Sequence, residues 1–233
     1  MKVPKIAALL FAVLFSSYSL TLAQGSTIDV SRIPATADQP SGFAPRGWKV
    51  EEAVKGDLNG DGTADYAIKL VEDKPVKPDE AVDSERALVV AFADGGKLKR
   101  AAVADKLLQC TSCGGAFYGV MAAPADVTVE KGVIVVVNEH GSRDVSNSTF
   151  RFRYDAPSGR FVLIGYDYAD HDRLTGAVNT ESTNYITGVR VTTMTKGKRT
   201  TTKRTHVGSD KVFLEDASGE DIEAAALHRL GLD

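Results

Sequence analysis

The residues with the clearest chemical meaning lie between Asp57 and Asp65, where the chain reads Asp-Leu-Asn-Gly-Asp-Gly-Thr-Ala-Asp. Side chains that carry oxygen occupy every second position, and a glycine follows the second and the third of them. A short loop of this kind can surround a hard cation such as Ca²⁺ with oxygen ligands. The spacing predicts a calcium site whose ligands are Asp57, Asn59, Asp61, the backbone carbonyl of Thr63, and Asp65.

The alternative interpretation of this stretch is a solvated Asn-Gly or Asp-Gly hairpin turn. Three carboxylates at this spacing would repel one another without a cation, which favours the metal site. Residues 65–71 alternate with the period of a strand, so we expect the loop to join two strands. An EF-hand places a bidentate Glu at the twelfth position of its loop, where this chain has Ile68. The predicted site is therefore a structural calcium clip and not an EF-hand.

Two cysteines, Cys110 and Cys113, form a second candidate site. In an exported protein they meet an oxidising compartment, so we predict a disulfide between them. A redox-active dithiol is the alternative, because this spacing can lower the pKa of a thiol. A metal site that adds His140 and His171 also stays open, although the spacing does not favour it.

Acid–base chemistry has two candidate clusters, Asn138-Glu139-His140 and the stretch 167–172 that contains His171. Each follows a predicted strand, and a histidine beside carboxylates could act as a general base. No nucleophile pattern such as Gly-x-Ser-x-Gly accompanies them. We therefore expect a non-catalytic protein, and an exported hydrolase that uses the His140 and His171 loops is the alternative.

The elements that position these residues are mostly strands. Alternating apolar residues and turn signals predict strands at residues 48–54, 65–71, 86–92, 97–103, 126–130, 133–138, 148–154, 160–166, 188–196 and 199–207. One helix is predicted at residues 220–230, with Ser218 as its cap and Gly231 at its end. The predicted fold is mainly β, built from antiparallel hairpins or a meander with one C-terminal helix.

The N-terminus indicates export. Lys2 and Lys5 precede an apolar run at residues 6–15, and Thr21-Leu-Ala23 offers the small residues of a cleavage site before Gln24. Residues 1–23 are thus a predicted signal peptide, and the protein is expected to be periplasmic or secreted. Residues 24–47 are rich in proline and predict an extended linker. Two β subdomains follow, the calcium-loop subdomain at residues 48–109 and the larger one at residues 110–233.

Charge gives one further restriction. The chain carries a formal net charge of −3, which argues against general nucleic-acid binding through a basic surface. A local basic stripe consists of Lys196, Lys198, Arg199, Lys203 and Arg204. No stacking aromatics are interleaved with it, so a charged hairpin edge that resists aggregation is the favoured interpretation. An electrostatic contact with an anionic envelope polymer or an acidic partner is the alternative.

The loop pattern Asp-x-Asn-x-Asp-Gly-x-x-Asp at residues 57–65, preceded by Gly56, resembles the calcium loops of FG-GAP and VCBS-type secreted proteins. The resemblance covers roughly residues 48–71 and implies a structural metal site in a binding or adhesion module. A glycan-binding, adhesion-like module is therefore one possible function. The motif occurs once, which counts against a propeller with one metal in each blade.

The architecture also resembles periplasmic immunity proteins related to I-type lysozyme inhibitors. Such proteins block peptidoglycan-cleaving enzymes by inserting a loop into the active site. The loop considered has a Ser-Gly pair followed by Tyr, whereas Ser158-Gly159 is followed here by Arg160 and Phe161. The resemblance implies that Ser158, Gly159 and Arg160 form a binding loop. The expected partner is a protein, such as a peptidoglycan hydrolase, or a cell-envelope polymer, and no membrane anchor is expected after cleavage.

Overall fold

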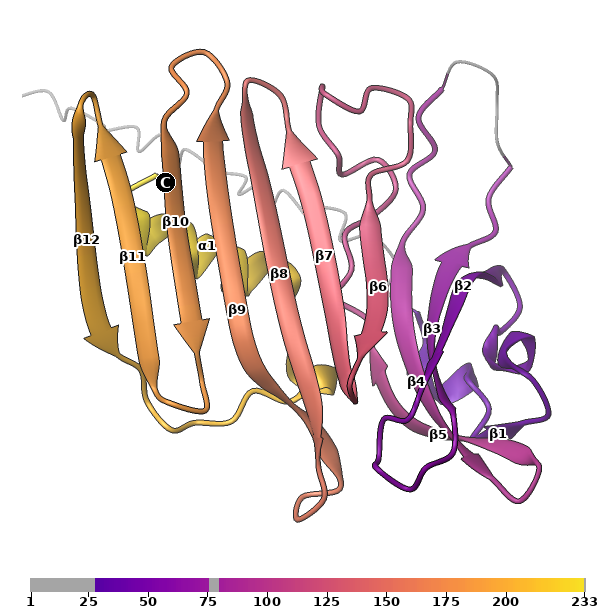
Figure 1. Cartoon of the computed structure of the whole chain (residues 1–233). Coiled ribbons are helices and arrows are strands. Elements are labelled where there is room, and N and C mark those ends of the chain that lie inside the picture. The colour runs from indigo at the N-terminus through magenta and orange to yellow at the C-terminus, as the bar shows by residue number, and fades with distance from the viewer. Residues whose placement is uncertain (1–27, 76–79, 233) are drawn as a thin grey trace, which may run out of the picture.

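The computed structural model describes residues 28–75 and 80–232. The predicted signal peptide and the first residues of the predicted linker lie outside this part. Within it the chain forms two antiparallel sheets and one helix near the C-terminus, which confirms the predicted mainly β fold (Figure 1). Among the described residues, no helix is both long enough and apolar enough to cross a bilayer.

The five-stranded sheet has the order β1-β5-β4-β3-β2 and is antiparallel throughout. Its strands are β1 (Thr36–Ala37), β2 (Trp48–Gly56), β3 (Asp65–Glu72), β4 (Arg86–Asp94) and β5 (Lys97–Ala104). Two short 3-10 helices accompany it, η1 (Val30–Arg32) before β1 and η2 (Pro40–Phe43) between β1 and β2.

The seven-stranded sheet is a meander in which each strand pairs with its neighbour in sequence. Its strands are β6 (Ala125–Glu130), β7 (Val133–Gly141), β8 (Asp144–Asp155), β9 (Arg160–Asp172), β10 (Val178–Asn184), β11 (Val189–Lys196) and β12 (Arg199–His206). The 3-10 helix η3 (Leu214–Asp216) and the helix α1 (Gly219–Leu230) complete the chain. Ser218 caps α1 by accepting the N–H of Asp221, and Gly231 ends it with a positive φ of 64°, as predicted.

All ten predicted strands are present, but two of the twelve described strands, the two-residue β1 and β10, were not predicted. The buried side chains of β10, Asn179, Glu181 and Thr183, are polar, so the segment lacks the apolar alternation that marks a strand. The polar ends of β8 and β9 were missed for the same reason. A strand whose buried partners are polar gives no hydrophobic signal in the sequence.

The two sheets share one core. A single cluster of buried residues joins the five-stranded sheet, for example Leu88 and Val90, to the seven-stranded sheet, for example Phe150 and Phe152. Ala226 of α1 belongs to the same cluster. The edge strands of the two sheets also meet, because an added Cβ at Gly56 in β2 would lie 2.3 Å from Cγ1 of Val129 in β6. The segments 48–109 and 110–233 are thus packed against each other through apolar side chains.

The segment predicted as an extended linker instead packs on the five-stranded sheet. Ile28, Ile33 and Phe43 are buried in a second apolar cluster on the outer face of that sheet. Short β1 pairs with β5, and Arg100 donates to the backbone carbonyl of Val30. The prediction of a linker with little core was wrong because its apolar residues are few and irregularly spaced among prolines. Each of these apolar residues nevertheless packs on the outer face of the five-stranded sheet and shields its apolar side chains from solvent.

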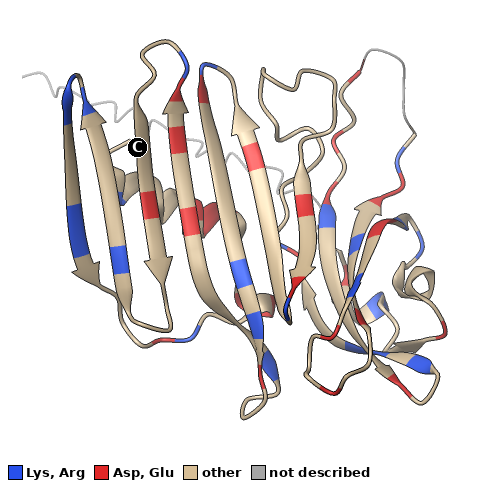
Figure 2. Ribbon diagram, viewed as in Figure 1, with Lys and Arg blue, Asp and Glu red and all other residues tan. Residues whose placement is uncertain are grey.

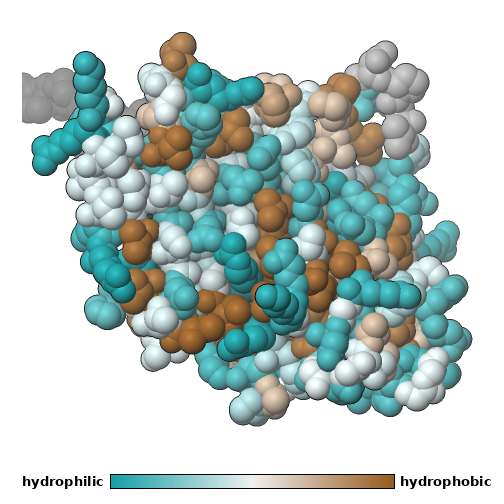
Figure 3. Space-filling view, viewed as in Figure 1, coloured by the Kyte–Doolittle hydropathy of each residue, from teal (hydrophilic) through white to brown (hydrophobic). Residues whose placement is uncertain are grey.

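The seven-stranded sheet has two unlike faces. On the helix face lie α1 and the buried side chains of Tyr166, Tyr168 and Glu181. The open face carries the alternate residues, for example Val135 and Thr193, and nothing among the described residues covers it (Figure 1). Figure 3 shows this open face as a mixture of apolar and polar side chains.

Candidate functional site

The predicted calcium loop connects β2 to β3 and is folded around its own backbone amides. Asp57 accepts the N–H of Gly60 at 2.7 Å on one carboxylate oxygen and the N–H of Gly62 at 2.9 Å on the other. Asp61 accepts the N–H of Thr63 at 2.7 Å and the Nδ2–H of Asn59 at 2.9 Å. These hydrogen bonds lower the pKa of Asp61, so its side chain is an anion at neutral pH.

Asp65 has a different environment from the other predicted ligands. It is fully buried, and its two carboxylate oxygens accept the N–H groups of Leu58, at 3.0 Å, and Ala93, at 2.9 Å. It therefore joins the start of the loop to β4, a contact that runs across 28 residues of sequence. This carboxylate supports the loop from behind, and Asp57, Asn59 and Asp61 are the members of the motif on its exposed side.

The loop's donor chemistry suits a hard cation, but the side chains are not gathered around one point. Across residues 28–75 and 80–232, no group of three or more His, Cys, Asp or Glu side chains is close enough to hold a metal ion. Gly60 and Gly62 both have φ of 83°, and no atom would obstruct a side chain there. The glycines are thus needed for the backbone conformation of the loop.

Cys110 and Cys113 are joined, with their sulfurs 2.10 Å apart, which confirms the predicted disulfide. It fixes the first residues of the segment 110–124 between the two sheets, which we call the disulfide loop. Ser112 in this loop donates to Asp83, and Gln109 just before it donates to the carbonyl of Glu139 at 2.7 Å. The pair lies among turns and has no helix behind it, so the structure lacks the helix start that usually activates a redox dithiol.

His140 and His171 lie in strands, not in loops as predicted, and on opposite faces of the seven-stranded sheet. His140 in β7 pairs with Ser146 on the helix face, whereas His171 in β9 pairs with Val145 on the open face. The strands continue through these polar stretches because neighbouring strands supply the backbone partners. The two histidines therefore do not share a site.

The helix face holds a hydrogen-bonded network around His140. Its Nε2 lies 2.6 Å from Oε1 of Glu223 in α1, and Ser148 donates to Oε2 of the same carboxylate at 2.9 Å. Tyr166 contacts Ser148 at 3.1 Å, oxygen to oxygen. The hydrogen bond to Glu223 raises the pKa of His140, against an opposing effect of burial. Because the carboxylate stands between hydroxyl and imidazole, the histidine is not placed to activate Ser148 as a nucleophile.

The predicted binding loop is the turn between β8 and β9. This hairpin projects beyond the other strands at one end of the molecule (Figure 1). Residues 156–159 at its tip are all exposed, and Gly159 has a φ of 67°. Ser158 donates to the Asp155 carboxylate at 2.6 Å, which closes the turn. The tip is thus an exposed, internally hydrogen-bonded projection.

Arg160, the third member of the predicted loop, belongs to the base of the hairpin. Its guanidinium lies 3.8 Å from the ring centroid of Phe213 and pairs with Asp216 at 2.8 Å and with Glu215 at 3.4 Å. Lys211 reaches Asp155 at 2.8 Å from the same C-terminal segment. These contacts brace the hairpin from below, so Arg160 positions the tip and does not form it.

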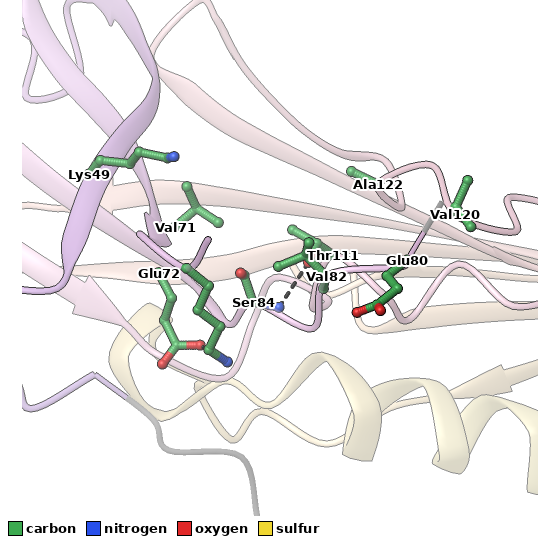
Figure 4. A pocket seen from close by; sticks show the side chains of 10 residues that line it. Lys49, Val71, Glu72, Glu80, Val82, Ser84, Thr111, Val120 and Ala122 are labelled. Carbon is green, nitrogen blue, oxygen red and sulfur yellow. Dashed lines mark hydrogen bonds and ion pairs between the residues drawn. The ribbon is translucent and has the colours of Figure 1, made fainter. Parts of the chain in front are cut away.

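A shallow pocket of about 280 Å³ lies beside the start of β2 and the disulfide loop (Figure 4). Lys49, Glu72, Ser84 and Thr111 line it together with apolar side chains. The Ser84 N–H already donates to Oγ1 of Thr111 at 2.9 Å. Its polar groups do not converge on one point as a reactive site requires.

Two buried ion pairs were not predicted from the sequence. Arg86 in β4 makes two hydrogen bonds of 2.8 Å to the carboxylate of Glu51 in β2. Arg229 in α1 makes two of 2.6 Å to Glu181 in β10, a carboxylate that is fully buried. Isolated charged residues in strands give no signal of this pairing, because their partners lie far away in sequence.

Comparisons with protein-family models, with curated proteins and with solved structures found no match.

Proposed function

We propose that this protein is an exported binding protein that inhibits a peptidoglycan-cleaving enzyme through the projecting β8–β9 tip. The observation that carries the proposal is the construction of the hairpin: its tip is fully exposed, while its base is fixed by the contacts of Arg160 and Lys211. A projection that is ordered before binding loses little conformational entropy when it enters a cleft. In the part of the chain that the structure describes, no comparable feature supports the adhesion-like and hydrolase functions.

Calcium has a structural place in this proposal. Asp57, Asn59, Asp61 and the carbonyl of Thr63 are the residues that would hold it, with Asp65 anchoring the loop from behind. When bound, the cation would neutralise the closely spaced carboxylates and stiffen the β2–β3 connection. This connection lies where the two sheets meet, since Gly132 in the β6–β7 turn approaches the carbonyl oxygen of Asp57. The site is thus proposed to stabilise the scaffold of the hairpin and not to take part in recognition.

The inhibition can be tested with purified peptidoglycan hydrolases and the exported protein, in the presence of calcium. We expect one of these enzymes to lose activity at micromolar protein or below. Ala156→Arg places a long charged side chain on the tip and should weaken that inhibition by roughly a hundredfold, because a bulky group at a cleft entrance blocks docking. Thr187→Arg in the exposed β10–β11 turn, at the same end of the sheet, is the matched control and should inhibit normally.

Two results would contradict the proposal. The first is the absence of binding to, and inhibition of, every hydrolase tested. The second is equal inhibition by the Ala156→Arg variant and the wild type, which would move the contact surface away from the tip. Hydrolytic activity of the protein itself, lost in His140→Ala, would instead support the enzyme alternative.

A further inference from the structure

The meander gathers three turns at the end of the molecule opposite the β8–β9 tip. They connect β7 to β8, β9 to β10, and β11 to β12, and they lie together at the top of Figure 1. The disulfide loop is fixed to them, because the Phe117 N–H donates to the Gly141 carbonyl at 3.0 Å and the Gly141 N–H to the Gly114 carbonyl at 3.0 Å. The Arg173 N–H donates to the Arg143 carbonyl at 3.1 Å. We call these turns and the disulfide loop the end surface.

The end surface concentrates the exposed apolar side chains of the molecule. The described residues include eight large apolar side chains that are strongly exposed; four of them lie on the end surface, and a fifth begins β10 directly beside it. They are Phe117 at 46 %, Val120 at 59 %, Met121 at 63 %, Leu174 at 76 % and Val178 at 40 % exposure. The three turns at the opposite end carry one, Ile186 at 59 %. Figure 3 shows apolar atoms along this upper edge, above β9 and over the disulfide loop. Clustering of this kind marks an interaction surface.

The charge of the end surface is basic, although the whole chain is acidic. Residues 141–144, 172–177 and 196–199 contain two acids, Asp144 and Asp172, and both pair with Arg143, at 3.9 Å and 2.8 Å. Four further basic residues remain: Arg173, Lys196, Lys198 and Arg199. The last three have no ion pair in the described structure, and Figure 2 shows the basic residues at these turns.

Arg173 connects the apolar and basic parts of the surface. Its guanidinium lies 4.3 Å from the ring centroid of Phe117, so the cation lies over an exposed aromatic ring. The neighbouring acid Asp83, in the segment before β4, accepts a hydrogen bond from Ser112 of the disulfide loop at 2.8 Å. Apolar tips and unpaired cations therefore occupy the same edge of one rigid sheet.

We propose that the end surface binds the anionic headgroup layer of a lipid bilayer. Apart from Val120, which lines the pocket beside β2, these apolar side chains line neither described pocket, and this suits insertion among lipids better than docking of a folded partner. Lys196, Lys198 and Arg199 add attraction to anionic headgroups. Strands that run away from this surface would hold the β8–β9 tip at the far end of the protein, away from the bilayer. The inference goes beyond the proposed inhibition and does not depend on it.

The test uses the protein as recovered from the cell envelope and its sedimentation with lipid vesicles. Vesicles of phosphatidylcholine and phosphatidylglycerol should carry it down, and pure phosphatidylcholine should do so weakly. The double variant Met121→Ser, Leu174→Ser should bind at least roughly tenfold more weakly, since two inserted side chains are lost. Ile186→Ser, an equally exposed apolar residue at the opposite end, is the matched control and should bind as the wild type does.

Charge is tested separately. Replacing Lys196, Lys198 and Arg199 by Gln should weaken binding to anionic vesicles by on the order of a hundredfold, because each basic residue near the surface contributes to the attraction. Lys131→Gln in the β6–β7 turn should have no effect. All these variants should keep the wild-type melting temperature. In solution without lipid, they should inhibit a hydrolase to the same extent as the wild type does.

Three outcomes would overturn the proposal: no sedimentation with anionic vesicles, unchanged binding by the Met121→Ser, Leu174→Ser variant, or equal loss in the Ile186→Ser control. A fourth result would also count against it: the wild type does not bind vesicles but binds a defined envelope protein, and the end-surface variants no longer bind that protein. The surface is then a protein interface and the membrane inference fails. None of these results bears on inhibition through the β8–β9 tip, so the two proposals fail independently.

Discussion

The two buried arginine–glutamate pairs are built in opposite ways. Where the five-stranded sheet meets the disulfide loop, the cation is the buried member: the Arg86 side chain is 2 % exposed and that of Glu51 is 28 % exposed. Where α1 meets the seven-stranded sheet, the anion is buried: Glu181 is 0 % exposed and Arg229 is 29 % exposed. Both pairs hold distant parts of the chain together, and the position of the unexposed charge decides which substitution is costly.

The neighbours of each buried charge differ as well. Arg86 has one carboxylate partner, and its remaining N–H groups donate to the backbone carbonyls of Gln109 and Ala123. Glu181 keeps a second cation, because Arg190 approaches it at 3.2 Å. A buried charge that loses its sole counter-charge is destabilised most, and one that retains another is partly protected.

The largest effect should follow from Glu51→Ala. It leaves the Arg86 guanidinium buried with only neutral carbonyls, so we expect the free energy of unfolding to fall by about 3–5 kcal/mol. Denaturant unfolding measures this. Asp73→Ala is the control in the same sheet, since its pair with Lys49 at 2.8 Å is more than half exposed on both sides and should contribute about 1 kcal/mol or less. Equal losses in the two variants would show that burial of Arg86 does not govern the energetics.

Removal of calcium should have the next largest effect on stability. It tests whether, besides the two buried ion pairs, a cation bound by the carboxylates of the β2–β3 connection stabilises the fold. Chelation should lower the melting temperature, and added Ca²⁺ should restore it. An ion at a hundredfold above its Kd adds about 2.7 kcal/mol to the free energy of unfolding. Asp57→Ala and Asp61→Ala should abolish the difference between the two conditions. A melting curve that does not respond to chelator would rule out the calcium site.

Arg229→Ala should cost less than Glu51→Ala, about 2 kcal/mol, because Arg190 still faces the buried carboxylate. The comparison becomes sharper with Glu181→Gln, which removes the buried charge itself. In the double variant the loss from Arg229→Ala should shrink, and a double-mutant cycle on unfolding free energies measures this coupling. Strict additivity of the two changes would mean that the pair contributes no coupling energy.

The smallest effect is the pH dependence of the His140–Glu223 contact, which also fastens α1 to the sheet. The folded-state pKa of His140 is raised, so its contribution is complete below the unfolded value of about 6.5 and disappears as pH rises through the folded value. Unfolding at pH 6 and pH 8 should show that the wild type loses more stability over this range than Glu223→Gln. The difference is small, because the His140 side chain is 35 % exposed. Identical pH profiles would exclude this linkage.

The sequence predicted those parts of the fold where the pattern is local. The apolar run at residues 86–92, the Gly197-Lys198 turn and the cap at Ser218 each depend on neighbouring residues, and each prediction was confirmed. The disulfide followed from the spacing of two cysteines and the expected compartment. Such features need no knowledge of the rest of the chain.

The features that were missed depend on partners distant in sequence. Glu181 is polar and looks solvent-exposed in the sequence, yet Arg229, 48 residues later, makes its burial possible. Ile33 and Phe43 look like isolated residues in a proline-rich stretch until the outer face of the five-stranded sheet is present. Likewise, the separation of His140 and His171 onto opposite faces depends on register, which one added residue would reverse.

Because α1 follows every strand of the described residues, its contacts set an order of events during folding. Its first residue donates from the Gly219 N–H to the Lys106 carbonyl at 2.8 Å, and Glu223 reaches back 83 residues to His140. The helix face therefore stays unsealed until the final segment is available. A chain that emerges from its N-terminus during synthesis would therefore hold an incomplete core until α1 has emerged.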